Sequence, residues 1–156
     1  MTESTESVID LARRLIRTPS QGGIDDPLPV IGTLGDWLAE HGLPFTILYD
    51  SDSRPVALLA EISGQAGPTY CLHACLDTAP IGDEESWSLP PTKGALIDGW
   101  LVGRGSADSK ISVALFAHLA IEMLGIRSRL RGTLSLLFDA DEHSGLFAGI
   151  KSYIAR

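Results

Sequence analysis

Chemically reactive side chains stand where the predicted β-strands of this chain end, and this arrangement constrains the fold more than any other feature. Three stretches carry them: Cys75 to Pro80, Gly103 to Lys110, and Asp139 to His143. In an open α/β sheet, ligands bind beyond the carboxyl ends of the strands. We therefore expect the three stretches to meet at one edge of a sheet.

Apolar periodicity predicts helices and strands along the whole chain. Helices are predicted from a cap at Ser7 to Thr18, from Pro27 to Gly42, from Ser109 to Leu124, and from Phe147 to Ile154. Strands are predicted at 44–49, 56–62, 69–76 and 133–138, with a turn at 64–67 and a short hairpin around Asp98-Gly99. Strands alternating with helices predict an α/β fold, a sheet with helices packed against it.

Length, composition and charge limit the classes of protein to which this chain can belong. The chain has 156 residues, of which 44% are apolar, so it can bury a core and one domain is expected. Its net charge of −8 leaves no basic surface for nucleic acid or for an anionic membrane. No apolar run approaches the roughly 20 residues that span a bilayer. Residues 1–6 are polar and acidic, unlike a secretory signal, so we expect a cytoplasmic protein.

The two cysteines lie in one predicted strand. Cys71 and Cys75 are four positions apart, roughly 13 Å, which is too far for a disulfide. Free thiols fit a reducing compartment. Cys71 is expected to be a small buried residue, and His73 a buried, hydrogen-bonded histidine.

Cys75 and Asp77 lie two positions apart near the end of that strand, so their side chains share one face. A carboxylate in such a place can orient a metal-ligating neighbour and raise its basicity. The alternatives are a buried thiol for Cys75 and a turn-starting carboxylate for Asp77.

Acidic and imidazole groups follow in the two later stretches. Asp108 comes after Gly103-Arg104-Gly105 and precedes a predicted helix, where it either caps the helix or bridges two metal ions. Glu142 and His143 follow the last buried strand. Acidic residues in such a place are commonly only solvated. The chemical interpretation makes Glu142 a general base that passes a proton from water to a leaving amine, and His143 a metal ligand.

Five motifs occur in order along most of the chain: residues 74–80 (Ala-Cys-Leu-Asp-Thr-Ala-Pro), Trp87 to Pro91, Asp98-Gly99, Gly103 to Lys110, and Asp141-Glu142-His143. As a set they resemble the zinc amidohydrolase and metallopeptidase family that includes aminoacylase, acetylornithine deacetylase, succinyl-diaminopimelate desuccinylase and carboxypeptidase G. The resemblance implies an α/β catalytic domain that uses two metal ions, commonly zinc, to hydrolyse amide bonds of N-acyl amino acids or peptides.

By position in these motifs, the resemblance implies a role for each candidate residue. Asp77 is similar to the carboxylate that orients a ligand, Asp108 to the bridging ligand, and Glu142 to the general base. Cys75 stands where the family has a histidine ligand, and His143 where it has a glutamate ligand. Thiolate and imidazole both bind zinc, and a thiolate favours zinc over manganese or magnesium. We expect one or two zinc ions, with cobalt or manganese as alternatives.

The resemblance further implies that residues 1–156 are the N-terminal half of a catalytic domain. The family's dimerisation domain is expected to be absent. So are its later catalytic segments, with two more metal ligands and the groups that bind the substrate carboxylate. A half-domain exposes apolar surface and an open sheet edge. We therefore expect a homo-oligomer or a complementary chain as partner, beside a small N-acyl amino acid or peptide as substrate.

Two other functions stay open at this point. One is a catalytically degenerate relative that acts as a binding or regulatory subunit, which the unusual residues at Cys75 and His143 favour. The other is a redox-sensitive protein with a reactive thiol at Cys75. Its acidic neighbours Asp77 and Asp108 disfavour this, because negative charge raises the pKa of a thiol.

Overall fold

The computed structural model of the chain describes residues 3–156, with side chains from Val8 onward. Its helices are α1 (Glu3–Ile16), α2 (Leu28–Glu40), α3 (Lys110–Gly125) and α4 (Ala148–Ile154), with short 3₁₀ turns η1 (Glu84–Ser86) and η2 (Arg127–Arg129). Its strands are β1 (Phe45–Tyr49), β2 (Pro55–Ser63), β3 (Gln65–Cys75), β4 (Ala95–Ile97), β5 (Trp100–Val102) and β6 (Arg131–Asp139).

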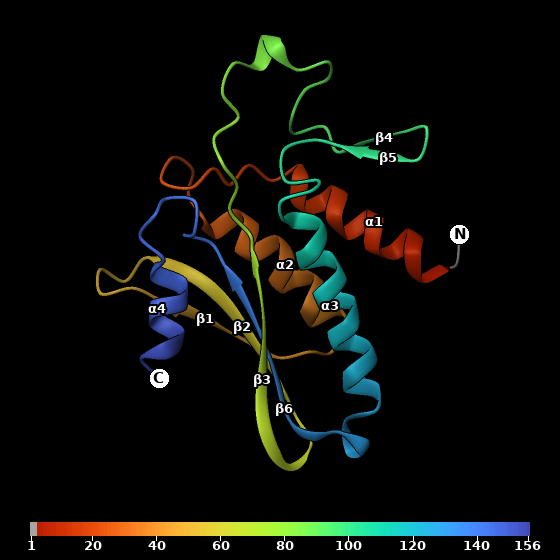
Figure 1. The fold of residues 1–156 in the computed structure, drawn as a ribbon, viewed down its shortest axis with the longest axis vertical. Helices are drawn as coiled ribbons and strands as arrows, with labels where there is room; N and C mark the ends of the chain where they lie inside the picture. The colour runs from red at the N-terminus through yellow and green to blue at the C-terminus, as the bar shows by residue number, and fades with distance from the viewer. Residues whose placement is uncertain (1–2) are drawn as a thin grey trace.

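Four strands form the main sheet, in the order β1-β2-β6-β3 (Figure 1). β6 runs antiparallel to β2 and parallel to β3, with Cys75 opposite Asp139 at the ends of the parallel pair. The last residues of β3 and β6 therefore lie side by side, and the segments that follow them leave from the same edge. This arrangement places two of the three reactive stretches together.

Helices cover both faces of the sheet, which confirms the predicted fold class. One core lies between the sheet and α1, α2 and α3. A smaller one lies between the opposite face and α4. Successive side chains of β2 point into different cores: Leu58 lies in the larger core and Leu59 in the smaller one. Both faces are buried there, so residues 56–60 of the strand are apolar in succession rather than alternating with polar residues.

The hairpin around Asp98-Gly99 is also confirmed. β4 and β5 pair antiparallel across these two residues. Both have positive φ, 49° at Asp98 and 83° at Gly99, as a two-residue hairpin turn requires.

Several boundaries differ from expectation, and three of them have a structural reason. α1 begins at Glu3 rather than at a cap on Ser7, whose side chain lies outside the described residues. β3 begins at Gln65, inside the predicted turn, because a register shift between Gln65 and Thr69 lets the strand continue. α4 begins at Ala148, since Phe147 adopts a left-handed conformation.

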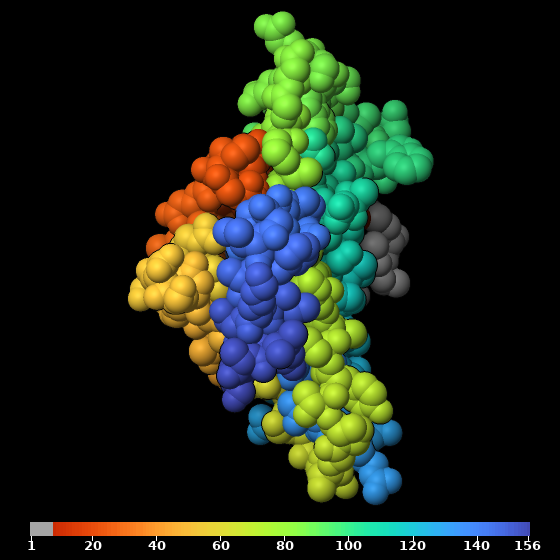
Figure 2. All heavy atoms as spheres, turned by 60° about the vertical axis from the view of Figure 1, so that its left-hand side comes forward, coloured from red at the N-terminus to blue at the C-terminus, as the bar shows by residue number. Residues whose placement is uncertain are grey.

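The outer edge of the sheet at β3 has no neighbouring strand among the described residues. Residues 65–71 of β3 are exposed, and the turn that joins β2 to β3 extends below the blue C-terminal region in Figure 2. Cys71 and His73 are exposed here, so the expectation that both are buried is wrong. Both lie on an edge strand, on the face of the sheet where α4 packs against β1, β2 and β6. Among residues 3–156, no helix is long and apolar enough to cross a membrane.

Candidate metal centre

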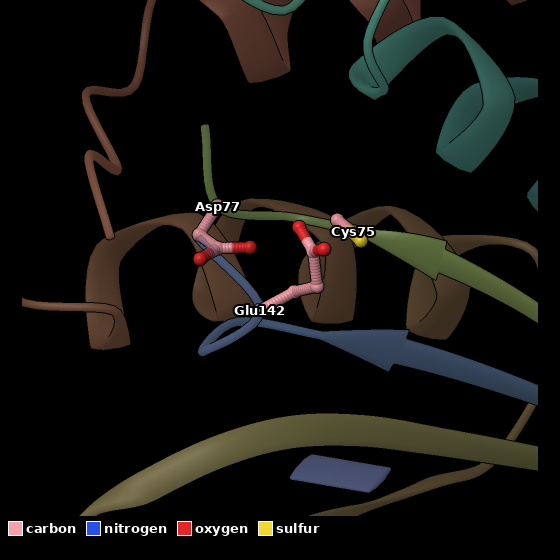
Figure 3. Close-up of side chains that lie close together, drawn as sticks. All are labelled: Cys75, Asp77 and Glu142. Atoms are coloured by element: carbon pink, nitrogen blue, oxygen red, sulfur yellow. The ribbon is translucent and has the colours of Figure 1, made fainter. Parts of the chain in front are cut away.

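Thiol and carboxylate groups converge where β3 and β6 end. A ligand atom from each of Cys75, Asp77 and Glu142 lies within 4.8 Å of the other two, and the three side chains point toward one another (Figure 3). Cys75 ends β3, Asp77 follows it, and Glu142 lies in the turn after β6. The parallel pairing of the two strands therefore builds this cluster from segments 65 residues apart in the chain.

Asp77 is buried and holds His143. One carboxylate oxygen accepts the backbone N–H of His143 at 2.7 Å, and the other lies 3.3 Å from its Nδ1. The side chain of Asp77 is 2% exposed. Burial raises the pKa of its carboxyl group, and the contacts with His143 oppose that rise. Among the described residues, no hydrogen bond joins Asp77 to Cys75. Of the candidate ligands, the one that Asp77 hydrogen-bonds is therefore His143.

The imidazole of His143 presents one nitrogen to each side of the site. Its Nδ1 faces two carboxylates, Asp77 and Glu142, the latter at 3.0 Å. Ionised carboxylates only accept hydrogen bonds, so Nδ1 carries the proton in the neutral ring. Nε2 then keeps its lone pair and lies 3.9 Å from Oδ2 of Asp108. Two donors at that separation can share one cation, since zinc bonds to nitrogen and oxygen at about 2.0–2.2 Å.

Asp108 does not cap α3. Ser109 occupies the N-cap position, and no side chain makes a capping hydrogen bond there. The Asp108 carboxylate is 81% exposed, and its nearest described ionic partner is His143. Of the two roles considered for Asp108, the capping role is therefore excluded.

The loop before α3 is anchored by Lys110. Its side chain is buried, and Nζ donates to the backbone oxygens of Leu15 at 2.8 Å and Thr18 at 2.7 Å. Gly105 packs against the Lys110 side chain with a φ of 89°, where a Cβ atom would lie 2.9 Å from Lys110 Cδ. The segment that carries Asp108 is thus tied to the end of α1.

The cluster of Cys75, Asp77 and Glu142 fits a divalent cation, and His143 and Asp108 form a neighbouring pair outside this group of three. Burial, followed by the charges of Glu142, Asp77 and Asp139, raises the pKa of the Cys75 thiol to about 12. This excess of negative charge is what a metal ion would neutralise, and thiolate, imidazole and carboxylate are all zinc ligands. The same surroundings oppose a reactive thiolate in the absence of a cation, which argues against the redox hypothesis.

Two residues that the sequence analysis left out support the site. Asp139 is fully buried, and its carboxylate accepts the backbone N–H groups of Asp141 and Ile150, which shapes the turn after β6. Ser109 hydrogen-bonds the backbone of Cys75. An acidic residue at the end of an apolar strand could have indicated Asp139, but nothing in the sequence singles out Ser109. His73 lies 3.7 Å from Asp139 and outside the cluster.

Comparisons with known proteins identify relatives of this chain. Succinyl-diaminopimelate desuccinylase from Rhodospirillum centenum is 34% identical over 151 residues, covering 94% of this chain and 38% of that protein. The Bacillus subtilis YXEP protein, a dinuclear metal binding peptidase from the M20 family, superimposes with a TM-score of 0.63 at 25% identity, over 94% of this chain and 40% of that one.

A third relative shows the fold at greater distance. The M20 metallo-carboxypeptidase Sso-CP2 from Sulfolobus solfataricus has a TM-score of 0.75 at 17% identity, over 90% of this chain and 31% of that one. The chain thus spans well under half the length of these relatives. The model of peptidase family M20/M25/M40 matches residues 71–156, more than half of the sequence, and the chain therefore belongs to that family.

Proposed function

We propose that this chain is the N-terminal part of the catalytic domain of a metal-dependent hydrolase that cleaves amide bonds in N-acyl amino acids or small peptides. The observation that carries the proposal is the convergence of Cys75, Asp77 and Glu142 at the ends of β3 and β6. Residues 1–156 would form this partial domain, with the dimerisation domain and the remaining catalytic segments lying outside them.

Zinc is the ion that the donor set favours, because a thiolate and an imidazole are soft and borderline ligands. Cys75, Asp108 and His143 would hold it, as one ion or as part of a pair, with cobalt or manganese as alternatives. Bound there, zinc would supply Lewis-acid polarisation of the amide carbonyl.

The chain's own residues then divide the remaining work. Glu142 is partly exposed, with 34% of its side chain accessible, so it can reach a water molecule as well as His143. We assign it the role of general base, which takes a proton from the attacking water and returns it to the leaving amine. Asp77 keeps His143 in position through two contacts. Asp77 is therefore a positioning residue.

The remaining surfaces fit an incomplete domain. The open edge of β3 lies at the margin of the sheet, and Leu115 and Leu119 on α3 are 51% and 40% exposed. We propose that a complementary segment or a second copy covers them, because open edges and apolar patches favour association. The free cysteines and the absence of a basic surface fit a cytoplasmic protein.

The test combines metal analysis with turnover. We expect the purified chain to bind zinc stoichiometrically and, when the remaining catalytic segments are supplied as a complementary chain, to hydrolyse members of a panel of N-acyl amino acids. Glu142→Gln should abolish hydrolysis while the bound zinc is retained. Absence of both zinc and turnover would contradict the proposal.

The alternative is a degenerate relative that acts as a binding or regulatory subunit. Cys75 and His143 favour it, since both are unusual for the family pattern. Zinc binding without turnover in the presence of the complementary chain, even in the double variant Cys75→His with His143→Glu, would support this alternative instead.

A further inference from the structure

The backbone of Cys75 faces the open edge of the sheet. Its neighbour Leu76 donates its N–H to the carbonyl of Asp139 on β6. Successive residues of a strand direct their hydrogen-bonding groups to opposite sides, so the N–H and C=O of Cys75 point away from β6. No strand lies on that side among the described residues. Without a partner in a loop, these two backbone groups would hydrogen-bond only to water or to a strand outside the described residues.

A single hydroxyl group satisfies both. Oγ of Ser109 accepts the N–H of Cys75 at 3.0 Å and donates to its carbonyl oxygen at 2.7 Å. Ser109 therefore pairs with the edge of β3 as a neighbouring strand would. These two hydrogen bonds join the backbone of Cys75 to the loop of residues 103–109. Burial raises the pKa of the Cys75 thiol, and a further contact of the Ser109 hydroxyl with that thiol opposes this larger effect.

This contact joins the segments that carry two of the three candidate ligands, Cys75 and Asp108. Ser109 is covalently attached to Asp108, whose own carboxylate is 81% exposed and has little to hold it. On the other side, Lys110 fixes the same segment to α1 through Leu15 and Thr18. The position of Asp108 relative to Cys75 therefore depends on the Ser109 hydroxyl.

We propose that Ser109 is a positioning residue that sets the separation between Cys75 and Asp108 and thereby determines the affinity of the site for zinc. This inference rests on the proposed function, because it assumes that both residues bind the metal. The Ser109 hydroxyl would hold these two ligands in position before an ion binds. Zinc affinity should accordingly respond to the hydroxyl rather than to the size of residue 109.

The test compares Ser109→Ala with Ser109→Thr, which keeps a hydroxyl. Ser112→Ala is the matched control, because Ser112 lies one turn into α3 and its hydroxyl makes no hydrogen bond among the described residues. All variants carry Cys71→Ser, so that Cys75 is the single thiol. Zinc affinity is measured by competition with a chromophoric chelator. Cadmium–thiolate absorbance reports the bond to Cys75.

We expect Ser109→Ala to weaken zinc binding by about 10- to 100-fold and to reduce the cadmium–thiolate absorbance. The Ser109→Thr variant should bind zinc nearly as the parent does, and the control should be unchanged. Thermal unfolding in chelator separates binding from folding. Lowered thermal stability with unaltered zinc affinity in Ser109→Ala would show that Ser109 only caps the strand, and would overturn the inference.

Two further outcomes are distinguishable. If Ser109→Ala does not fold, Ser109→Val and Ser109→Thr form a second pair, equal in shape and differing in the hydroxyl. Equal zinc affinity of those two would also overturn the inference. If the parent chain binds no zinc, the proposed function itself fails, whereas a zinc-binding parent with an equally competent Ser109→Ala variant removes only the role of Ser109.

Discussion

At the scale of single residues, the site depends on which side chain Asp77 contacts. The spacing of Cys75 and Asp77 predicts that the carboxylate orients position 75. The structure places both oxygens of Asp77 on His143 instead. Because a carboxylate oxygen of Asp77 also lies within 4.8 Å of the Cys75 sulfur, the effects of substitutions at 75 and 143 should not be independent.

We predict that His143→Glu alone destabilises the metal-free protein. The new carboxylate would lie against Asp77 and Glu142, where the imidazole is now 3.3 Å and 3.0 Å away, and like charges at such distances repel. Adding Cys75→His should recover part of the loss, because it offers Asp77 an imidazole partner. Chemical unfolding in chelator of the two single variants and the double variant measures this coupling. Strictly additive changes in unfolding free energy would contradict it.

A second residue-scale prediction concerns the buried Lys110. Burial lowers the pKa of its ammonium group from 10.5 to about 8. Between about pH 8 and pH 10.5, the unfolded chain therefore binds more protons at this group than the native chain, so its contribution to stability rises with pH. Below pH 8 both states are protonated, and the cost of burying the charge is constant.

Comparison with Lys110→Met, which cannot titrate, isolates this effect. The unfolding free energy of the wild type should rise relative to that of the variant across this window, by at most about 3 kcal/mol. Unfolding at several pH values between 7 and 11 measures the difference. A difference that is flat with pH, or that falls, would show that Lys110 is not desolvated in the native state.

At the scale of elements, the turn after β6 and the start of α4 are built around Asp139. Its fully buried carboxylate accepts the N–H of Ile150. Gly149 lets the helix approach closely, since a Cβ atom there would nearly overlap the same carboxylate. α4 thereby fixes the carboxylate that ends β6, and with it the turn that holds Glu142.

We predict opposite effects for two glycine-to-alanine changes in helices. Gly149→Ala should destabilise the protein by about 2 kcal/mol or more, because the added methyl group displaces α4 from Asp139. Gly32→Ala in α2 meets no atom within 4 Å and should stabilise it by up to about 1 kcal/mol. Urea unfolding of both variants provides the measurement. Equal and favourable effects would mean that α4 does not pack on Asp139 as described.

The helices and strands were largely predictable from the sequence, whereas the contacts between loops were not. Apolar periodicity and the Asp98-Gly99 turn predicted the sheet, its helices and the hairpin, because these depend on local preference and burial. Burial of Cys71 was predicted wrongly, since periodicity does not reveal that β3 is an edge strand. The contacts of Asp77 with His143 and of Ser109 with Cys75 depend on how loops fold across distant segments, and no local pattern encodes them.

At the scale of the whole molecule, the chain brings five candidate residues to one end of a sheet while spanning about 38% of the Rhodospirillum centenum relative. At the margin of the same sheet, the outer edge of β3 has no neighbouring strand within residues 3–156. Tyr70 on that strand is 65% exposed. A long exposed edge is a template for pairing with another chain.

We therefore predict concentration-dependent association of the purified chain. Tyr70→Lys should weaken it, because a lysine on an edge strand opposes edge-to-edge pairing. Sedimentation velocity over a range of concentrations provides the measurement, and Tyr49→Lys on β1, at the other edge of the sheet, serves as the control. Association that persists in Tyr70→Lys but is lost in Tyr49→Lys would place the contact elsewhere.

We propose above all that thiol, imidazole and carboxylate groups of this chain bind zinc. X-ray absorption spectroscopy of the zinc-loaded Cys71→Ser chain tests it most directly. The account predicts one sulfur ligand at about 2.3 Å together with nitrogen and oxygen ligands near 2.0–2.2 Å, and loss of the sulfur in Cys75→Ser. A zinc shell of nitrogen and oxygen alone, with Cys75 intact, would contradict it.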